Sequence, residues 1–147
     1  MASETVNIAG GCHCGEIRYQ LKWPLQVQQV PARACGCSYC TRFAAIWTSH
    51  PDAGIDLTFE TANTATRYRF GTATADFIHC ANCGILCLAI SPVDGHDYAI
   101  VNINTLSLPK GYAFDHSCPD FSAEETLDRL ARRKHRWIGA VKRQILR

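Results

Sequence analysis

The sequence predicts a mainly β fold that is stabilised by zinc and followed by a C-terminal α-helix. Three observations carry this prediction: apolar and polar residues alternate over much of positions 5–103, seven of the nine cysteines fall in short clusters, and the last segment has helical periodicity. With 147 residues, of which 47% are hydrophobic and 19% charged, the chain is long enough to bury a core of its own.

Strands are expected where the alternation runs between turn signals such as PDAG at 51–54 and DGH at 94–96. In the segment 16–23, four large apolar residues recur at every second position and so share one face: Ile17, Tyr19, Leu21 and Trp23. The further strands are expected at 25–30, 44–49, 55–60, 66–70, 76–80, 85–91 and 97–103.

Residues 122–147 predict a basic amphipathic helix, packed on or extending from a domain formed by residues 1–121. Ser122 is the expected N-cap, and Glu125 follows three positions later, as in a capping box. The apolar residues near one face at helical spacing are Leu127, Leu130, Ile138, Val141 and Ile145.

The positive charge of the chain is concentrated in this last segment. Residues 123–147 carry eight Lys/Arg against three acids, whereas the whole chain has a net charge of only +2. The helix therefore either packs with a solvated basic face or binds an acidic partner such as nucleic acid or anionic lipid.

No targeting or membrane segment is expected. The first ten residues have neither a basic nor an apolar region, and the longest apolar run, CGILCLAI at 83–90, is far shorter than the roughly 20 residues that span a bilayer. These features predict a cytoplasmic protein. Disulfides are rare in that reducing compartment, so clustered cysteines are expected to bind metal or to carry out redox chemistry.

The clustered cysteines form two pairs and one triplet. They are Cys12 and Cys14 (CHC), Cys35, Cys37 and Cys40 (CGCSYC), and Cys80 and Cys83 (CANC). Structural zinc takes four protein ligands, whereas catalytic zinc takes three and keeps its fourth position for water or substrate. The glycine after CANC, Gly84, suits the turn that wraps such a pair around one ion.

Spacing alone leaves the division of the ligands open. The two pairs could fill a closed site, which would leave the triplet as an open one. Alternatively, the last two cysteines of the triplet could join CANC as a zinc ribbon, with CHC and Cys35 left over. A disulfide is a third alternative, although short Cys-x-Cys loops are strained.

Several other residues near these motifs have simpler expected roles. Cys87 lies in an apolar run and is expected to be buried, and Cys118 lies in a polar segment as an accessory thiol. His13 and His79 adjoin cysteines, but neighbouring residues on a strand point to opposite faces, so they are expected to be structural histidines.

The succession GGCHCGEIRY, CGCSYCTR and FGTATADFIHCANCGI, over roughly residues 8–107, resembles the family of glutathione-dependent formaldehyde-activating enzymes and centromere-protein-V-like proteins. The resemblance implies an Mss4-like β fold with two zinc sites. Gly36 and Phe77 depart from the family pattern, which often has histidine at both positions. The implied ligands are Cys12, Cys14, Cys80 and Cys83 for a structural zinc, and Cys35, Cys37 and Cys40 for an open catalytic zinc.

The implied activity is that of a carbon–sulfur lyase, the reversible addition of glutathione to formaldehyde to give S-hydroxymethylglutathione. Its partners would be a small thiol and a small aldehyde. Because glutathione carries two carboxylates, Arg42, two residues after the triplet, is the expected substrate-binding residue. The alternative is a non-enzymatic zinc module that uses its basic C-terminal helix to bind nucleic acid or protein.

Overall fold

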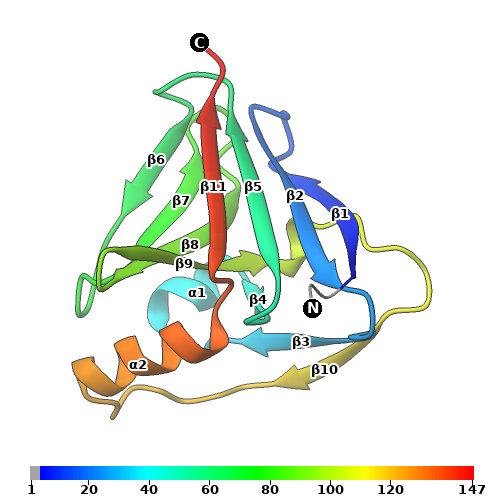
Figure 1. Ribbon diagram of the computed structural model, residues 1–147. Helices are drawn as coiled ribbons and strands as arrows, with labels where there is room; N and C mark the ends of the chain where they lie inside the picture. Colours follow the sequence, from blue (N-terminus) through cyan, green and yellow to red (C-terminus); the bar gives the residue numbers. More distant parts are fainter. Residues whose placement is uncertain (1–3) are drawn as a thin grey trace.

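The computed structural model describes residues 4–147 and consists of two β-sheets with two helices beside them (Figure 1). The first sheet has the order β1 (Thr5–Gly11), β2 (Ile17–Pro24), β5 (Gly54–Phe59), β11 (Ala140–Ile145). The second has the order β10 (Ala113–Ser117), β3 (Gln29–Ala34), β4 (Ile46–Thr48), β9 (His96–Asn102), β8 (Leu86–Val93), β7 (Asp76–Cys80), β6 (Ala65–Tyr68). The helices are α1 (Ser38–Arg42), α2 (Thr126–Arg136) and the short 3-10 helix η1 (Ile103–Thr105).

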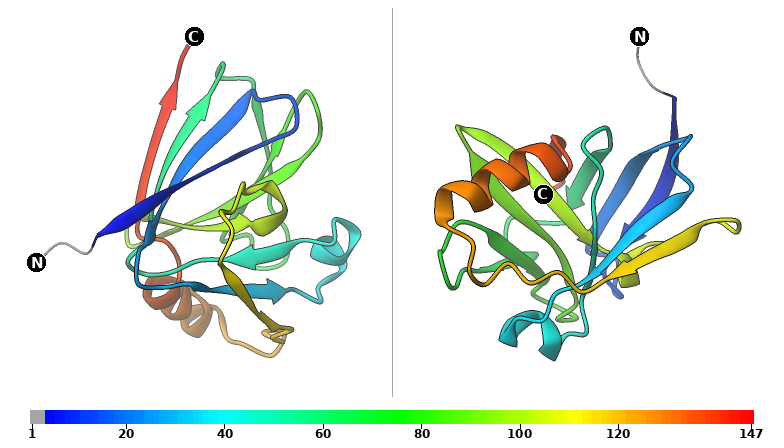
Figure 2. Two further views of the ribbon diagram at one scale, coloured as in Figure 1. Left: turned by 90° about the vertical axis from the view of Figure 1, so that its right-hand side faces the viewer. Right: turned by 90° about the horizontal axis from the view of Figure 1, so that it is seen from below.

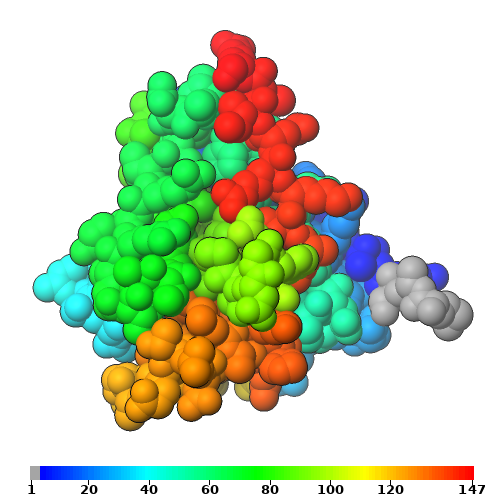
Figure 3. All heavy atoms as spheres, turned by 60° about the vertical axis from the view of Figure 1, so that its left-hand side comes forward, coloured from blue at the N-terminus to red at the C-terminus, as the bar shows by residue number. Residues whose placement is uncertain are grey.

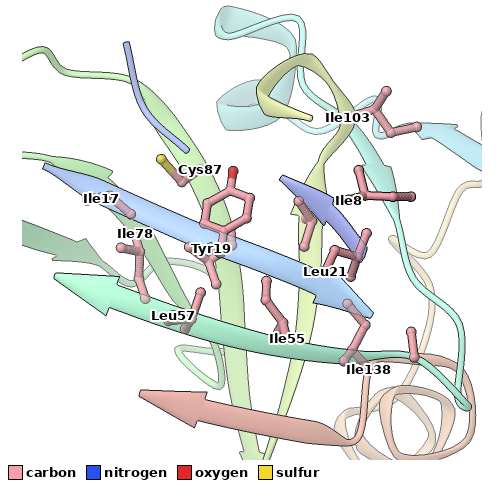
Figure 4. Close-up of a cluster of buried hydrophobic side chains, with 14 of the residues drawn as sticks. Ile8, Ile17, Tyr19, Leu21, Ile55, Leu57, Ile78, Cys87, Ile103 and Ile138 are labelled. Atoms are coloured by element: carbon pink, nitrogen blue, oxygen red, sulfur yellow. The ribbon is translucent and has the colours of Figure 1, made fainter. Parts of the chain in front are cut away.

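The main core lies between the four-stranded sheet and the central strands of the larger one (Figure 2). On β2 the predicted face is confirmed, because the residues at every second position from Ile17 to Trp23 are all buried. Figure 4 shows Tyr19 of this face beside Cys87 of β8, which is buried as expected. The mainly β prediction is therefore confirmed, and the period of two in the sequence corresponds to one buried sheet face.

Seven of the eight predicted strands are confirmed to within two residues at each end. The prediction for 25–30 is wrong in position, because the chain turns there before β3 begins at Gln29. The Val27 N–H donates to the Pro24 carbonyl at 3.0 Å, and the Trp23 indole donates to the Val27 carbonyl at 2.7 Å. Neither α1 nor β10 was predicted.

The predicted helix over 122–147 is wrong in its extent. Ser122 precedes α2 rather than capping it, and Glu125 is the N-cap residue, without a side-chain capping bond. The face of α2 also differs from the prediction, since Leu127 is 81% exposed whereas Arg133 is buried. No helix among residues 4–147 is both long and apolar enough to cross a membrane.

The helix ends at Arg136 because the next residues join the sheets. Trp137 has an extended backbone with ψ 163°, and Ile138 exchanges two backbone hydrogen bonds with Ala99 of β9, at 2.9 and 3.0 Å. Residues 140–145 then form β11, which pairs in parallel with β5. Long-range strand pairing therefore replaces the second half of the predicted helix.

Replacement of Ile138 by alanine tests this arrangement. Ile138 is fully buried, so Ile138→Ala should lower the free energy of unfolding by about 2–5 kcal/mol. Leu127→Ala is the matched control and should change the free energy of unfolding by less than about 0.5 kcal/mol. In one continuous helix Leu127 and Ile138, about three turns apart, would lie on the same face. Equal decreases in the free energy of unfolding for the two variants, measured by urea denaturation, would contradict the observed fold.

Candidate functional site

Two clusters of cysteine sulfur atoms stand out in the structure. The first contains Cys12, Cys14, Cys80 and Cys83, and the second contains Cys35, Cys37 and Cys40. Within each cluster the sulfur atoms all lie within 4.8 Å of one another. Both groupings match the division of ligands that the family resemblance implies.

The four-cysteine cluster joins two turns that belong to different sheets. Cys12 and Cys14 lie in the turn between β1 and β2, and Cys80 and Cys83 lie at the turn between β7 and β8. The Sγ atoms of Cys12 and Cys14 are 3.6 Å apart, and those of Cys14 and Cys80 are 3.5 Å apart. Four sulfurs around one zinc at 2.3 Å would be about 3.8 Å apart, so the donor set and its spacing fit tetrahedral zinc.

Local backbone geometry brings these sulfurs together. Gly15 and Gly84 follow the two pairs with φ of +83° and +81°, a conformation that favours glycine, as expected for Gly84. Backbone N–H groups point at the sulfurs: Ile17 donates to Cys12 Sγ at 3.3 Å, and Cys83 donates to Cys80 Sγ at 3.4 Å. Such donors favour the thiolate, which is the form that binds metal.

The three-cysteine cluster is formed at the end of β3. Cys35 follows this strand, Cys37 is the N-cap of α1, and Cys40 lies within α1 and is buried. The Cys40 N–H donates to Cys37 Sγ at 3.3 Å, so the first turn of the helix holds two of the sulfurs together. A hydrogen bond from Cys40 lowers the pKa of Cys35 to about 5 despite its burial, and the positive charge of Arg129 contributes in the same direction. Three thiolates fit a metal that keeps one coordination position for a ligand.

A cavity of about 390 Å³ adjoins this cluster, and all three of its cysteines line the wall. The volume lies in the range typical of small-molecule sites, roughly 300–1,000 Å³. The four-cysteine cluster does not line it. The aromatic part of the wall comes from Trp47, Phe70, Phe77, Phe121 and Trp137.

The polar part of the wall contains four arginines: Arg33, Arg129, Arg132 and Arg133. Three of them belong to α2, which lies against the β8–β9 hairpin in Figure 3. Among the described residues that line the cavity, none is acidic. Burial, together with neighbouring arginines, lowers the pKa of Arg33 and of Arg133 to about 10, so both remain charged at neutral pH.

Each of the three α2 arginines in the cavity wall is held in a defined position. Arg133 donates through Nη1 to Thr74 Oγ1 at 2.7 Å and to Ser91 Oγ at 3.0 Å. Arg132 donates to the carboxylate of Glu124 through Nε at 3.0 Å and through Nη2 at 3.1 Å. Arg129 donates to the Phe121 carbonyl at 2.9 Å. The buried face of this helix is therefore its arginine face.

The sequence-based candidates outside the clusters lie elsewhere. Arg42 is exposed at the end of α1, where it donates to the Ser38 carbonyl, and it is not among the residues that line the cavity. His79 is hydrogen-bonded to the Tyr39 hydroxyl, and burial lowers its pKa. Neither His13 nor His79 belongs to the two sulfur clusters found among residues 4–147.

The α2 arginines were not predicted as site residues. The sequence contained one signal, the concentration of eight basic residues after position 122, but this charge was assigned to a solvent-facing surface. The apolar periodicity predicted a packing face that includes Leu127, whereas the structure buries Arg133 and leaves Leu127 exposed.

Comparison with known proteins found a matching family model and a similar solved structure. The model of the family described as glutathione-dependent formaldehyde-activating enzyme matches residues 7–118. A crystal structure of a Rhodobacter sphaeroides protein is similar at a TM-score of 0.52 and 27% identity, covering 74% of this chain and 99% of that one. No curated protein matches. The match spans both cysteine clusters and most of the chain, and the protein therefore belongs to the glutathione-dependent formaldehyde-activating enzyme family.

Proposed function

We propose that the protein is a zinc-dependent enzyme of the carbon–sulfur lyase type that adds a thiol such as glutathione to formaldehyde or a related small aldehyde. The observation that carries this proposal is the position of the three-cysteine cluster in the wall of a ligand-sized cavity. Family membership supports a role related to glutathione and formaldehyde.

The two clusters are assigned different roles because of their ligand counts. Cys12, Cys14, Cys80 and Cys83 are proposed to hold a structural zinc, since four sulfurs complete a tetrahedron. Cys35, Cys37 and Cys40 are proposed to hold a second zinc, which would keep one coordination position for a thiol and would favour its thiolate form. In the overall reaction the sulfur forms a bond to the carbonyl carbon and the thiol proton ends on the carbonyl oxygen, so no oxidant is needed.

The residues around the cluster suit this chemistry. Trp47 and Trp137, both buried, give the cavity an apolar lining beside the sulfurs, and Phe77 contributes a further aromatic wall. Such a lining keeps water away from the reacting carbonyl and strengthens electrostatic interactions inside the cavity. The space beside Gly36 in the triplet is open, because a Cβ added to this glycine would meet nothing within 4 Å.

The alternative of a non-enzymatic zinc module that binds nucleic acid or protein stays a prediction. The arginine face of α2 lines the cavity, and this observation favours a small-molecule ligand over a nucleic-acid surface. The proposed partners are therefore a small thiol and a small aldehyde.

Metal content tests the two assignments. The purified chain should carry two zinc ions per molecule, measured by native mass spectrometry. Cys37→Ser should lose one ion and keep the fold, whereas Cys80→Ser should lose the other ion together with much of the far-UV dichroism, because structural zinc contributes directly to folding. Cys118→Ser is the control and should keep both ions, since this exposed cysteine lies outside both clusters. A wild-type chain without zinc would refute the proposal.

Catalysis is tested by NMR exchange spectroscopy of glutathione and formaldehyde. The wild-type protein should accelerate their interconversion with S-hydroxymethylglutathione. Cys37→Ser should reduce the acceleration by more than the roughly 10- to 100-fold that follows loss of an outer-shell partner of a metal site. Cys118→Ser should leave it unchanged. Full activity in a Cys37→Ser protein that has lost its zinc would rule out the proposed mechanism.

A further inference from the structure

We propose that α2 and Arg33 form a carboxylate-binding end of the cavity, so that the preferred thiol is one that carries a carboxylate. This inference rests on the proposed function, because it takes the three-cysteine cluster as the place where the thiol sulfur binds. The helix lies beyond residues 7–118, the part of the chain that matches the family model. The α2 part of the proposed recognition element therefore lies outside the matched residues, whereas Arg33 lies within them.

The first argument is the charge balance around the cavity. Four arginines line it, and their one acidic partner among the described residues is Glu124, which pairs with Arg129 at 3.9 Å and with Arg132 at 3.0 Å. Arg33 and Arg133 have only neutral hydrogen-bond partners there. A zinc ion with three thiolates would have a net charge of −1, so an excess of about two positive charges remains to attract an anion.

The second argument is the supply of free donors. Arg132 and Arg133 already use several N–H groups and are stacked on aromatic rings, with guanidinium-to-centroid distances of 3.7 Å to Phe121 and 4.9 Å to Trp137. Arg129 donates one hydrogen bond, from Nη2 to the Phe121 carbonyl, and its Nη1 has no hydrogen-bond partner among the described residues. Arg129 therefore keeps a donor for a ligand acceptor.

Arg33 is the second arginine that we propose binds the carboxylate. It donates one hydrogen bond, from Nη2 to Ser49 Oγ at 2.7 Å, and this bond holds the guanidinium while other N–H groups stay available. A guanidinium matches the two oxygens of a carboxylate as a fork. We assign the anion as a carboxylate because the same arginine cluster already holds one in this way, that of Glu124 on Arg132.

The third argument is size. A cavity of about 390 Å³ is far larger than formaldehyde needs, so most of the space is available to the thiol. The sulfurs, the arginines and several aromatic side chains line the same cavity. A ligand that carries both a thiol and a carboxylate matches these two kinds of polar lining residue.

The test compares glutathione with its diethyl ester, which keeps the thiol and has no carboxylate. Binding to the zinc-loaded protein is followed by tryptophan fluorescence, because Trp47 and Trp137 line the cavity. The wild-type protein should bind glutathione at least tenfold more tightly than the ester, roughly the effect of one charge-assisted hydrogen bond. Arg129→Gln and Arg33→Gln should each raise the Kd for glutathione by roughly 10- to 100-fold and leave the Kd for the ester unchanged.

Lys134→Gln is the matched control, because it removes one positive charge from an exposed position of the same helix. It should leave both Kd values unchanged. An equal loss of glutathione binding in Lys134→Gln and Arg129→Gln would overturn the inference, and so would equal affinity of the wild-type protein for the two thiols. The unchanged Kd for the ester shows that a variant is folded. Stronger competition by inorganic phosphate than by acetate would overturn the assignment to a carboxylate.

The binding experiment needs no turnover, so the two proposals can fail separately. A clear preference for glutathione without any acceleration of its reaction with formaldehyde would refute the proposed function and support the inference. Acceleration by a protein that binds both thiols equally would support the proposed function and overturn the inference. If Arg42→Gln weakens glutathione binding more than Arg129→Gln does, recognition lies at α1 and the inference is overturned.

Discussion

The convergence of Cys12 and Cys14 with Cys80 and Cys83 is the constraint on which the rest of the structure depends. The first pair belongs to a turn of the four-stranded sheet and the second to a turn of the seven-stranded sheet. A metal bound by all four would crosslink the two layers at the edge of their shared core. Because β7 leads into Cys80, the same link positions Phe77, which lines the cavity.

The cavity is assembled from segments that are distant in sequence, and its wall combines sulfur and guanidinium groups. Soft sulfur ligands come from the end of β3 and from α1, whereas hard cationic donors come mainly from α2. Thiolate sulfur suits zinc, and guanidinium suits oxyanions, so the two groups do not compete for the same part of a ligand. Aromatic side chains complete the wall, and such low-polarity surroundings strengthen both kinds of interaction.

The position of α2 depends on what holds the helix at its two ends. At the start of the helix, Arg129 donates to the Phe121 carbonyl and Arg132 pairs with Glu124, so the helix is connected to the segment that precedes it. After the helix, Ile138 pairs with Ala99 of β9. Arg133 contributes a buried polar anchor on Thr74 and Ser91. Strand β11 then continues along β5. A short helix is thus oriented by long-range hydrogen bonds rather than by an apolar face of its own.

What the sequence by itself determined was local. The alternation around Ile17 and Tyr19 predicted a strand with one buried face, and the tight cysteine spacings, with glycine after CANC, predicted metal-binding turns, because both depend on backbone geometry over a few residues. Only the tertiary structure decided where the last helix stops. The apolar residues after Arg136 fall at helical spacing, yet pairing with β9 and β5 selected an extended backbone. That distant contact turned Arg129 and its neighbours toward the cavity, which no local pattern could predict.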